Sequence, residues 1–275
     1  MANFHLPPQG FGPGSQPEDE ELIYTAMPSG MRTYSPHLPD IDDETGAEPA
    51  LDMLAAIAEA CRVCAETGAT ASFDMAAMPA PARRLMAETL GAGEVAAKLR
   101  GIPALSVQES VFAGVWAVAG AGVDRVEVAP IPPEAISRAH APHRPALGRD
   151  APRGPAVVNA PPLLAELVDK SAIWAQGDLP HVVNLTLLPH TPEDLEWLDA
   201  ALGEGAVTIL SRGYGNCRVT ATALHHVWKV QFFNSMDALI LDTYEVTTMP
   251  EVALAAAEDL ADSGDRILKV LEAIR

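Results

Sequence analysis

The sequence predicts an α+β protein made of two similar units, each a helix layer packed on an antiparallel sheet, with a flexible N-terminal arm. Three observations predict this fold: an internal repeat, strand-like runs of alternating residues, and a proline-rich acidic N-terminus. When residues 90–118 are aligned with residues 202–230, ten of the 29 positions are identical, including Trp116 with Trp228. Such a repeat indicates two copies of one structural unit. We therefore expect an arm at residues 1–48, a first unit at 49–136, a linker at 137–160 and a second unit with C-terminal helices at 161–275.

The arm is predicted from its composition. Residues 1–50 contain nine acidic side chains, one basic side chain and eight prolines. Such a segment buries too little apolar surface to offset the loss of chain entropy on folding, so we expect it to be flexible. Within it, Met27, Met31 and Tyr34 form a less polar stretch that we predict to dock onto a sheet or a partner protein.

Each unit is expected to begin with a helix, a strand and a second helix. In the first unit these fall at residues 51–66, at 71–77 and between Pro79 and Gly91; in the second they fall at 163–176, at 181–187 and between Pro189 and Gly203. Thr191 has the residue type and position of an N-cap, because a proline and two acidic residues follow it. Glycine at the helix ends suits the positive φ of a C-cap.

Four strands are expected to complete each sheet. In the second unit they are residues 206–211, 217–223, 227–233 and 238–243, and residues 234–237 form the last hairpin turn. Residues 251–261 and 266–274 are predicted to be helical and to belong to the second unit alone. The linker contains four arginines, one aspartate and four prolines.

Charge and hydropathy exclude several partners. The formal net charge is −19 and the sequence pI is about 4.6, so nucleic acids and anionic membranes are unfavourable partners. No apolar run approaches the ~18 residues of a membrane-spanning helix, and residues 1–10 lack the basic and apolar pattern of a secretion signal. We therefore expect a cytoplasmic location.

Candidate reactive residues are few. Cys61 and Cys64 form a C-x-x-C pair, which in other contexts binds metal or exchanges disulfides, but here they lie late in a predicted helix, where two buried helix residues are favoured. His225 and His226 are neighbours on a strand and point to opposite faces, so they cannot share a metal. We find no catalytic constellation, and we expect a protein without enzymatic activity, catalytic residues, metal site or cofactor.

The segment around Tyr214 is the most unusual. Arg212, Tyr214, Asn216 and Arg218 place two cations, an aromatic ring and an amide around one loop, a combination suited to protein contacts. The first unit has a similar Arg-Gly turn at residues 100–101, which indicates a structural turn instead. Both interpretations stay open: a structural turn or a protein-binding loop.

Longer strings in the same region resemble a known family. RGYGNCR at residues 212–218, VWKVQFFNS at 227–235 and LDTYEV at 241–246 resemble the HupH/HyaF hydrogenase expression/formation family, and the resemblance covers nearly the whole chain. The family looks like one with a twice-occurring C-terminal domain, in line with the internal repeat.

The resemblance implies a non-enzymatic, chaperone-like accessory protein for the maturation of uptake [NiFe]-hydrogenase. The implied client is the precursor of the iron–sulfur small subunit, bound before export through the twin-arginine route, together with a thioredoxin-like accessory protein. The alternative is an iron–sulfur or metal carrier or repair protein that uses Cys61, Cys64 and Cys217.

Overall fold

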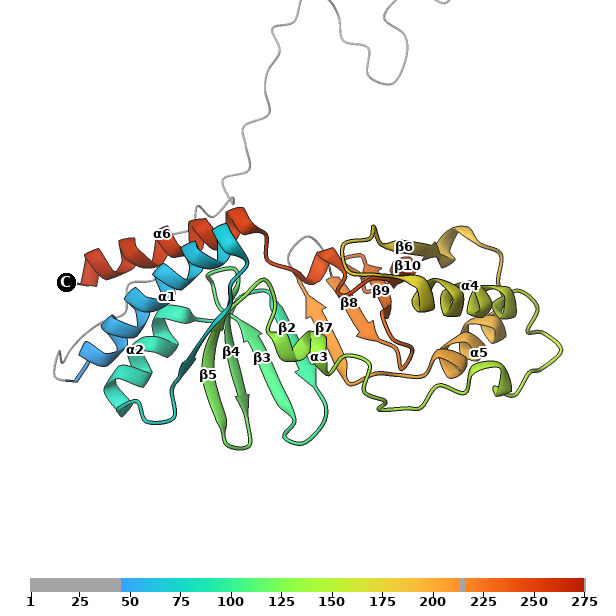
Figure 1. Ribbon diagram of the computed structural model, residues 1–275, viewed down its shortest axis with the longest axis horizontal. Coiled ribbons are helices and arrows are strands. Elements are labelled where there is room, and N and C mark those ends of the chain that lie inside the picture. Colours follow the sequence, from blue (N-terminus) through green and yellow to red (C-terminus); the bar gives the residue numbers. More distant parts are fainter. Residues whose placement is uncertain (1–45, 213–215, 275) are drawn as a thin grey trace, which may run out of the picture. The chain divides into compact units, whose positions relative to one another are not determined.

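The computed structural model describes residues 46–212 and 216–274, which fall within one compact unit (Figure 1). The predicted binding residues Met27, Met31, Tyr34 and Tyr214, and the arm as far as residue 45, lie outside the described residues.

Within the described residues, ten antiparallel strands form a single sheet, in the order β1-β5-β4-β3-β2-β7-β8-β9-β10-β6. The strands of the first half are β1 (Ala71–Asp74), β2 (Val95–Leu99), β3 (Leu105–Glu109), β4 (Val115–Gly120) and β5 (Val123–Val128). Those of the second half are β6 (His181–Asn184), β7 (Val207–Ser211), β8 (Asn216–Ala221), β9 (Val227–Phe233) and β10 (Leu239–Val246). The α+β prediction is confirmed, although the two halves share one sheet.

The two halves meet along β2 and β7. Val95 pairs with Ser211 and Leu99 pairs with Val207, so Ala97 and Ile209 lie opposite each other at the centre. These two central residues are separated by the same 112 positions that relate the sequence repeat. The strand order therefore reads alike from both ends, with β1 and β6 at the two edges.

Helices cover the outer strands. The α-helices are α1 (Glu48–Thr67), α2 (Ala80–Leu90), α3 (Pro133–Ser137), α4 (Ala160–Ile173), α5 (Pro192–Leu202) and α6 (Ala257–Ile274); short 3-10 helices occupy Gly148–Asp150, Leu185–Leu187 and Glu251–Ala253. Buried residues of α1, α2 and α6 share one core with β4 and β5, whereas those of α4 and α5 share another with β6, β9 and β10. Figure 1 shows the two helix groups over opposite ends of the sheet.

The C-terminal helix lies where the sequence did not predict it. Residues 257–274 form one continuous helix, and α6 packs along α1 of the first half. Gly264 permits this contact, because a Cβ atom there would lie 2.8 Å from the carbonyl oxygen of Ala58. The amphipathic sequence of α6 indicates a helix but not the element that buries its apolar side.

Local sequence explains the ends of α5. The Thr191 side chain accepts a hydrogen bond from the backbone N–H of Asp194, and the Asp194 side chain accepts one from that of Thr191, which is the predicted cap in its reciprocal form. Oδ1 of Asp194 also accepts from the backbone N–H groups of Val158, Asn159 and Ala160 at 2.8–2.9 Å. Burial raises the pKa of Asp194, but these backbone donors outweigh it and lower the pKa to about 2. One carboxylate therefore joins the N-termini of α4 and α5.

The two faces of the central strands differ. On one face, Ala97, Val107, Ile209 and Val219 belong to a core that α3 and the segment around Met249 complete. On the other, side chains between the helix groups stay accessible: Lys98, Ser106, Leu210 and Arg218 are exposed, and Thr208 and Thr220 are half-buried. We call this second side of β2, β3, β7 and β8 the open face.

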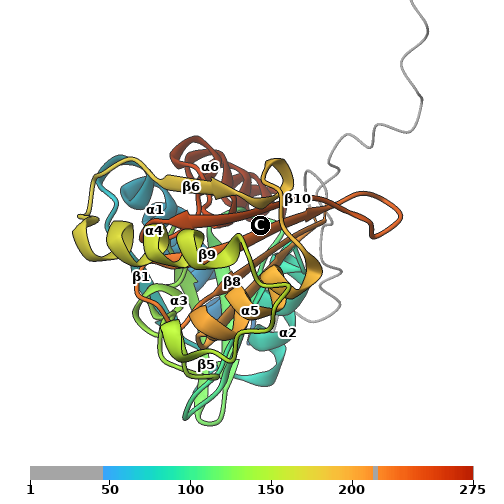
Figure 2. The same ribbon diagram turned by 90° about the vertical axis from the view of Figure 1, so that its right-hand side faces the viewer.

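Strand ends depart from the prediction in two places. The predicted strands at residues 71–77 and 181–187 are shorter, and Leu185–Leu187 form a 3-10 turn. The last strand is longer than predicted, and Figure 2 shows the β9–β10 hairpin projecting beyond its neighbours. Asn234 explains the hairpin turn, because its side-chain oxygen accepts from the backbone N–H groups of Met236 and Ala238.

Candidate functional site

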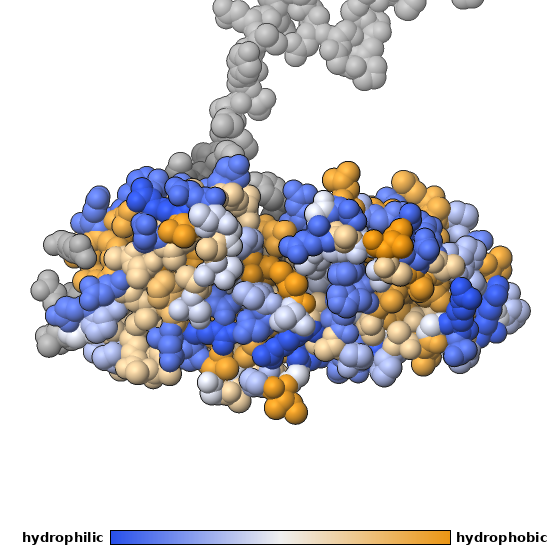
Figure 3. Space-filling view, in the orientation of Figure 1, coloured by the Kyte–Doolittle hydropathy of each residue, from blue (hydrophilic) through white to orange (hydrophobic). Residues whose placement is uncertain are grey.

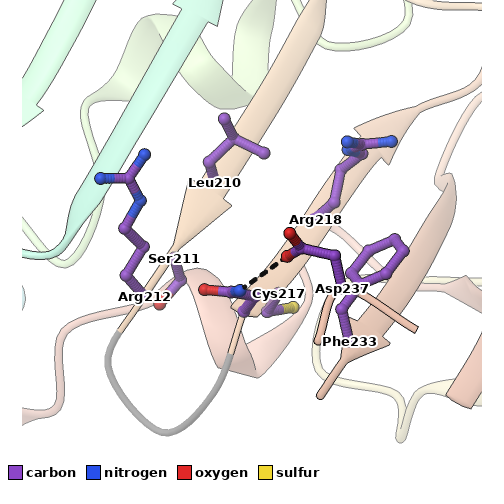
Figure 4. Close-up of a pocket in the computed structure, with 8 residues that line it drawn as sticks. Leu210, Ser211, Arg212, Cys217, Arg218, Phe233 and Asp237 are labelled. Atoms are coloured by element: carbon purple, nitrogen blue, oxygen red, sulfur yellow. Dashed lines mark hydrogen bonds between the residues drawn. The ribbon is translucent and has the colours of Figure 1, made fainter. Parts of the chain in front are cut away.

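A pocket of about 390 Å³ opens at the end of the open face. Its walls come from the last residues of β7, the start of β8 and the β9–β10 hairpin; they are Leu210, Ser211, Arg212, Asn216, Cys217, Arg218, Phe233 and Asp237. Figure 4 shows Leu210 between the side chains of Arg212 and Arg218. Three of the sequence-predicted binding residues, Arg212, Asn216 and Arg218, are thus brought together, and the role predicted for them stays a prediction.

Contacts within the pocket fix two of its side chains. The guanidinium carbon of Arg218 lies 5.5 Å from the centre of the Phe233 ring, within the range of a cation–π contact. The side-chain amide of Asn216 donates to Oδ1 of Asp237 at 3.2 Å (Figure 4). The arginine therefore has a defined position while its N–H donors stay accessible to a ligand.

A second pocket, of about 340 Å³, continues along the open face and shares Arg218. Its base holds a half-buried network in which the Lys229 ammonium donates to both carboxylate oxygens of Asp199 at 2.7 and 2.9 Å. The Tyr244 hydroxyl donates to the same carboxylate at 2.6 Å. The pKa of Tyr244 is raised well above its usual value, mainly because the side chain is buried and also because the Asp199 carboxylate lies beside it. The network is satisfied internally, so Lys229 does not offer a free cation.

Other cations beside the second pocket are also paired. Glu204 accepts from Arg144 at 3.0 Å and lies 3.1 Å from an Arg100 nitrogen. Arg212 and Arg218, by contrast, form no ion pair with any described residue. Among the cations that line the two pockets, those without an ion pair to a described residue are therefore Arg212 and Arg218.

The three cysteines do not form a common site. Cys61 and Cys64 belong to the core between α1, α2 and α6, whereas Cys217 belongs to the core on the side of the sheet opposite the open face. Burial raises the pKa of Cys61 to about 12 and that of Cys217 to about 11, so both thiols are protonated near neutral pH. Because Cys217 lies in a different core from Cys61 and Cys64, the three thiols are not placed to ligate one cluster together.

Three histidines gather beside Trp228. The expectation that His225 and His226 point to opposite faces of a strand was wrong, because they lie in the turn between β8 and β9 with ring centroids 4.0 Å apart. The rings of His140 and His225 stack with centroids 5.1 Å apart, and Nε2 of His140 accepts from the backbone N–H of His226 at 3.1 Å. Nδ1 of His140 lies 3.0 Å from the carbonyl oxygen of Thr222 and is therefore the protonated nitrogen. Both nitrogens of His140 are thus occupied by backbone groups. In residues 46–212 and 216–274, no three His, Cys, Asp or Glu side chains are arranged to hold a metal.

Sequence reasoning missed three residues of the pocket, Leu210, Phe233 and Asp237. Leu210 and Phe233 are exposed or half-buried apolar residues on strands, and Asp237 lies in the hairpin turn. The alternation in β7 contained a signal for Leu210, because Val207 and Ile209 are buried and Leu210 must then face the other way. Phe233 and Asp237 approach only through the β8–β9 pairing, in which Asn216 lies opposite Phe233.

Over the face seen in Figure 3, hydrophobic residues are scattered among hydrophilic ones. None of the described helices is both long enough and apolar enough to cross a membrane.

Comparisons with known proteins place this fold in a family. The model of the HupH hydrogenase expression protein, C-terminal conserved region, matches residues 48–141 and again residues 157–274. The hydrogenase expression/formation protein HupH of Rhodobacter capsulatus is 66% identical over 276 residues, which span 100% of both chains. HoxQ of Cupriavidus necator, also named a hydrogenase expression/formation protein, is 43% identical over 99% of this chain and 98% of its own.

Two further proteins are similar over part of the chain. The hydrogenase-1 operon protein HyaF of Escherichia coli is 32% identical over 66% of each chain. The solved structure of hydrogenase expression protein HupH from Thiobacillus denitrificans is 31% identical, with a TM-score of 0.38, and covers 40% of this chain and 92% of that one. From the two matches to the family model and the full-length relatives, the chain belongs to the HupH hydrogenase expression protein family.

Proposed function

We propose that this chain is a chaperone-like accessory protein in the maturation of uptake [NiFe]-hydrogenase, and that it binds the precursor of the iron–sulfur small subunit before export. Full-length relatives carry the name hydrogenase expression/formation protein, which supports a role in hydrogenase maturation. In this proposal the protein works in the cytoplasm, beside a thioredoxin-like accessory protein, and performs no catalysis itself.

The observation that carries the proposal is the open face with its pocket. Four central strands present polar and charged side chains between two helix groups, and one end holds Arg212, Arg218 and Phe233 around the exposed Leu210. Arginine and aromatic residues with apolar neighbours are the types that contribute most to protein–protein affinity. A rigid sheet bearing such residues is suited to hold a client chain, and Tyr214 borders the same loop in sequence.

The metal-carrier alternative is not favoured. It needs Cys61, Cys64 and Cys217 to act together, and they lie in two cores on different sides of the sheet.

The experiment is a capture of the client from cells that make the hydrogenase. Tagged protein should retain the small-subunit precursor, and a chain with Arg212→Gln, Tyr214→Ala and Arg218→Gln should retain much less while its thermal unfolding stays unchanged. A chain with Arg149→Gln serves as the control, because Arg149 is an exposed arginine outside both pockets. Retention of the precursor by the triple variant at the level of the control would refute the open face as the docking surface.

A further inference from the structure

The first pocket of the open face combines two accessible cations with one carboxylate among its described lining residues. Arg212 and Arg218 are exposed, line this pocket and form no ion pair with a described residue. The carboxylate of Asp237 accepts a hydrogen bond from the side-chain amide of Asn216. Guanidinium groups bind carboxylates through paired, charge-assisted hydrogen bonds. The pocket is therefore suited to a carboxylate from outside the protein.

The position of the two arginines is partly set before a ligand binds. The backbone N–H of Arg212 donates to the carbonyl oxygen of Glu94 at 3.1 Å, which joins the end of β7 to the residue before β2. The guanidinium carbon of Arg218 lies 5.5 Å from the centre of the Phe233 ring. Such a contact leaves the guanidinium N–H donors available. Side chains that are already positioned lose less conformational entropy when they bind.

Apolar surface lies directly beside these cations. Leu210 is 41% exposed, lies between Arg212 and Arg218 in Figure 4, and is the cross-strand neighbour of Arg218 in the β7–β8 pairing. The half-buried ring of Phe233 borders the same pocket. Cross-strand neighbours on one face have Cβ atoms about 5 Å apart. A ligand that covers Leu210 therefore has an apolar side chain within one or two residues of its carboxylate.

Further along the open face, the surface changes from charged to neutral. Apart from Arg218, the cations that line the second pocket are paired with Glu204 or Asp199. Thr208 and Thr220 lie opposite each other there and present hydroxyl groups. A long run of carboxylates finds no further unpaired cation among these residues, and the formal net charge of −19 repels polyanions. A short acidic segment fits this surface better than a polyanion does.

We propose that the Arg212–Arg218 pocket binds an extended segment of a partner protein in which one aspartate or glutamate stands directly beside an apolar residue. The carboxylate is held by the two guanidinium groups, and the apolar side chain covers Leu210 and reaches Phe233. Uncharged polar residues of the same segment then lie over Thr208 and Thr220. The inference rests on the proposed function for its protein partner, and it adds the class of sequence that the pocket recognises.

The test selects ligands without assuming their full sequence. A phage library of random peptides is passed over the immobilised full-length protein, and the recovered peptides are measured by fluorescence anisotropy. One variant carries Arg212→Gln and Arg218→Gln. The matched control carries Arg84→Gln and Arg149→Gln, which removes the same charge from two exposed arginines outside both pockets.

We expect the recovered peptides to share an Asp or Glu directly beside an aliphatic or aromatic residue. Their Kd should rise about 10-fold or more in the pocket variant and stay unchanged in the control variant. Changing the Asp of a peptide to Asn, or its Glu to Gln, should give a loss of similar size on the unmodified protein. This second measurement does not depend on the folding of any variant.

Recovered peptides without a carboxylate would overturn the inference, and so would equal binding of the peptides by the pocket variant and the control. Failure to recover any peptide, together with binding of phosphatidylglycerol vesicles that is lost in the pocket variant, would overturn it as well, because the ligand would then be a lipid surface.

Competition with the small-subunit precursor separates this inference from the proposed function. If the acidic–apolar peptides bind as expected but do not displace the precursor, the recognised sequence class is right and the pocket is not the client site. If binding of the precursor requires Arg212 and Arg218 but no acidic–apolar peptide is recovered, the client site stands and the sequence class is wrong.

Discussion

The role proposed for Arg218 in client binding follows from the side chains that surround it. It extends from β8 onto the open face, lies over the Phe233 ring at 5.5 Å, and has no carboxylate partner among the described residues. Lys229 lies one strand away and is neutralised by Asp199, so Arg218 and Lys229 differ in what they offer a ligand.

Replacement of Arg218 should therefore weaken client binding without unfolding the protein. We expect Arg218→Gln to lower the affinity for the small-subunit precursor by about 5- to 30-fold, in the range of an interface hot spot of 1–2 kcal/mol. Titration calorimetry checks the affinity, and urea unfolding checks the fold. The control Arg149→Gln should bind like the unmodified chain; similar losses for both variants would mean that only net charge matters.

His140 predicts a pH dependence of stability. Burial is the largest cause that lowers its pKa, to about 4, whereas an unfolded chain has a histidine pKa of about 6.5. The unfolded state therefore binds the proton more readily, and the free energy of unfolding falls as the pH falls from about 6.5 toward 4, by up to ~1.4 kcal/mol per pH unit from this group.

Carboxyl groups whose pKa is raised by burial, such as those of Glu109 and Glu245, increase the free energy of unfolding as the pH falls and so oppose the effect of His140. A comparison of histidine variants is therefore needed to isolate the contribution of His140. We expect the free energy of unfolding, measured in urea, to fall less steeply between pH 6.5 and 4.5 in the His140→Gln variant than in the unmodified chain. His143→Gln, at an exposed histidine three residues away, should keep the slope of the unmodified chain. An unchanged slope in His140→Gln would contradict the assignment.

Among the elements, α6 links the end of the chain to its first half. It follows β10 in sequence but packs on α1, where Gly264 faces Ala58 and Cys61. The sequence indicated helical residues at both ends of this segment, and it could not show that they form one helix on the other half of the molecule. Helical periodicity reports the apolar side of a helix, whereas the element that covers this side depends on the whole topology.

Replacement of Gly264 by alanine has two effects of opposite sign on the free energy of unfolding. In an isolated helix, Gly→Ala adds up to about 1 kcal/mol of stability. Here the new Cβ would lie 2.8 Å from the backbone oxygen of Ala58, so α6 must move away, and overpacking of this kind typically costs 1–3 kcal/mol.

We therefore expect Gly264→Ala to lower the free energy of unfolding, measured in urea. Gly154→Ala is the matched control, because no atom lies within 4 Å of a Cβ there. An increase in stability for Gly264→Ala would show that α6 does not pack closely on α1.

For the molecule as a whole, sequence reasoning reached the α+β fold and most helices and strands. The matched residues Trp116 and Trp228 lie at the second position of β4 and β9, in strands that mirror each other across the sheet. The sequence did not predict that β2 and β7 join the halves into one sheet, because the alternating residues of a strand specify its buried face and not the strand that pairs with it.

The candidate site was predictable to the extent that it is local. Arg212, Asn216 and Arg218 are close in sequence, so their grouping could be inferred. Phe233 and Asp237 enter the pocket through strand pairing about twenty residues along the chain, and the open face exists only because the helix groups cover the outer strands.

The most direct test of the open face as the client surface is site-specific photo-cross-linking. A photoreactive phenylalanine analogue at Leu210, which is 41% exposed, is compared with the same analogue at Val63 of α1, which is 40% exposed but lies outside both pockets. Illumination in the presence of the small-subunit precursor should give a covalent adduct from position 210 and little or none from position 63. An adduct from position 63 without one from position 210 would contradict the account.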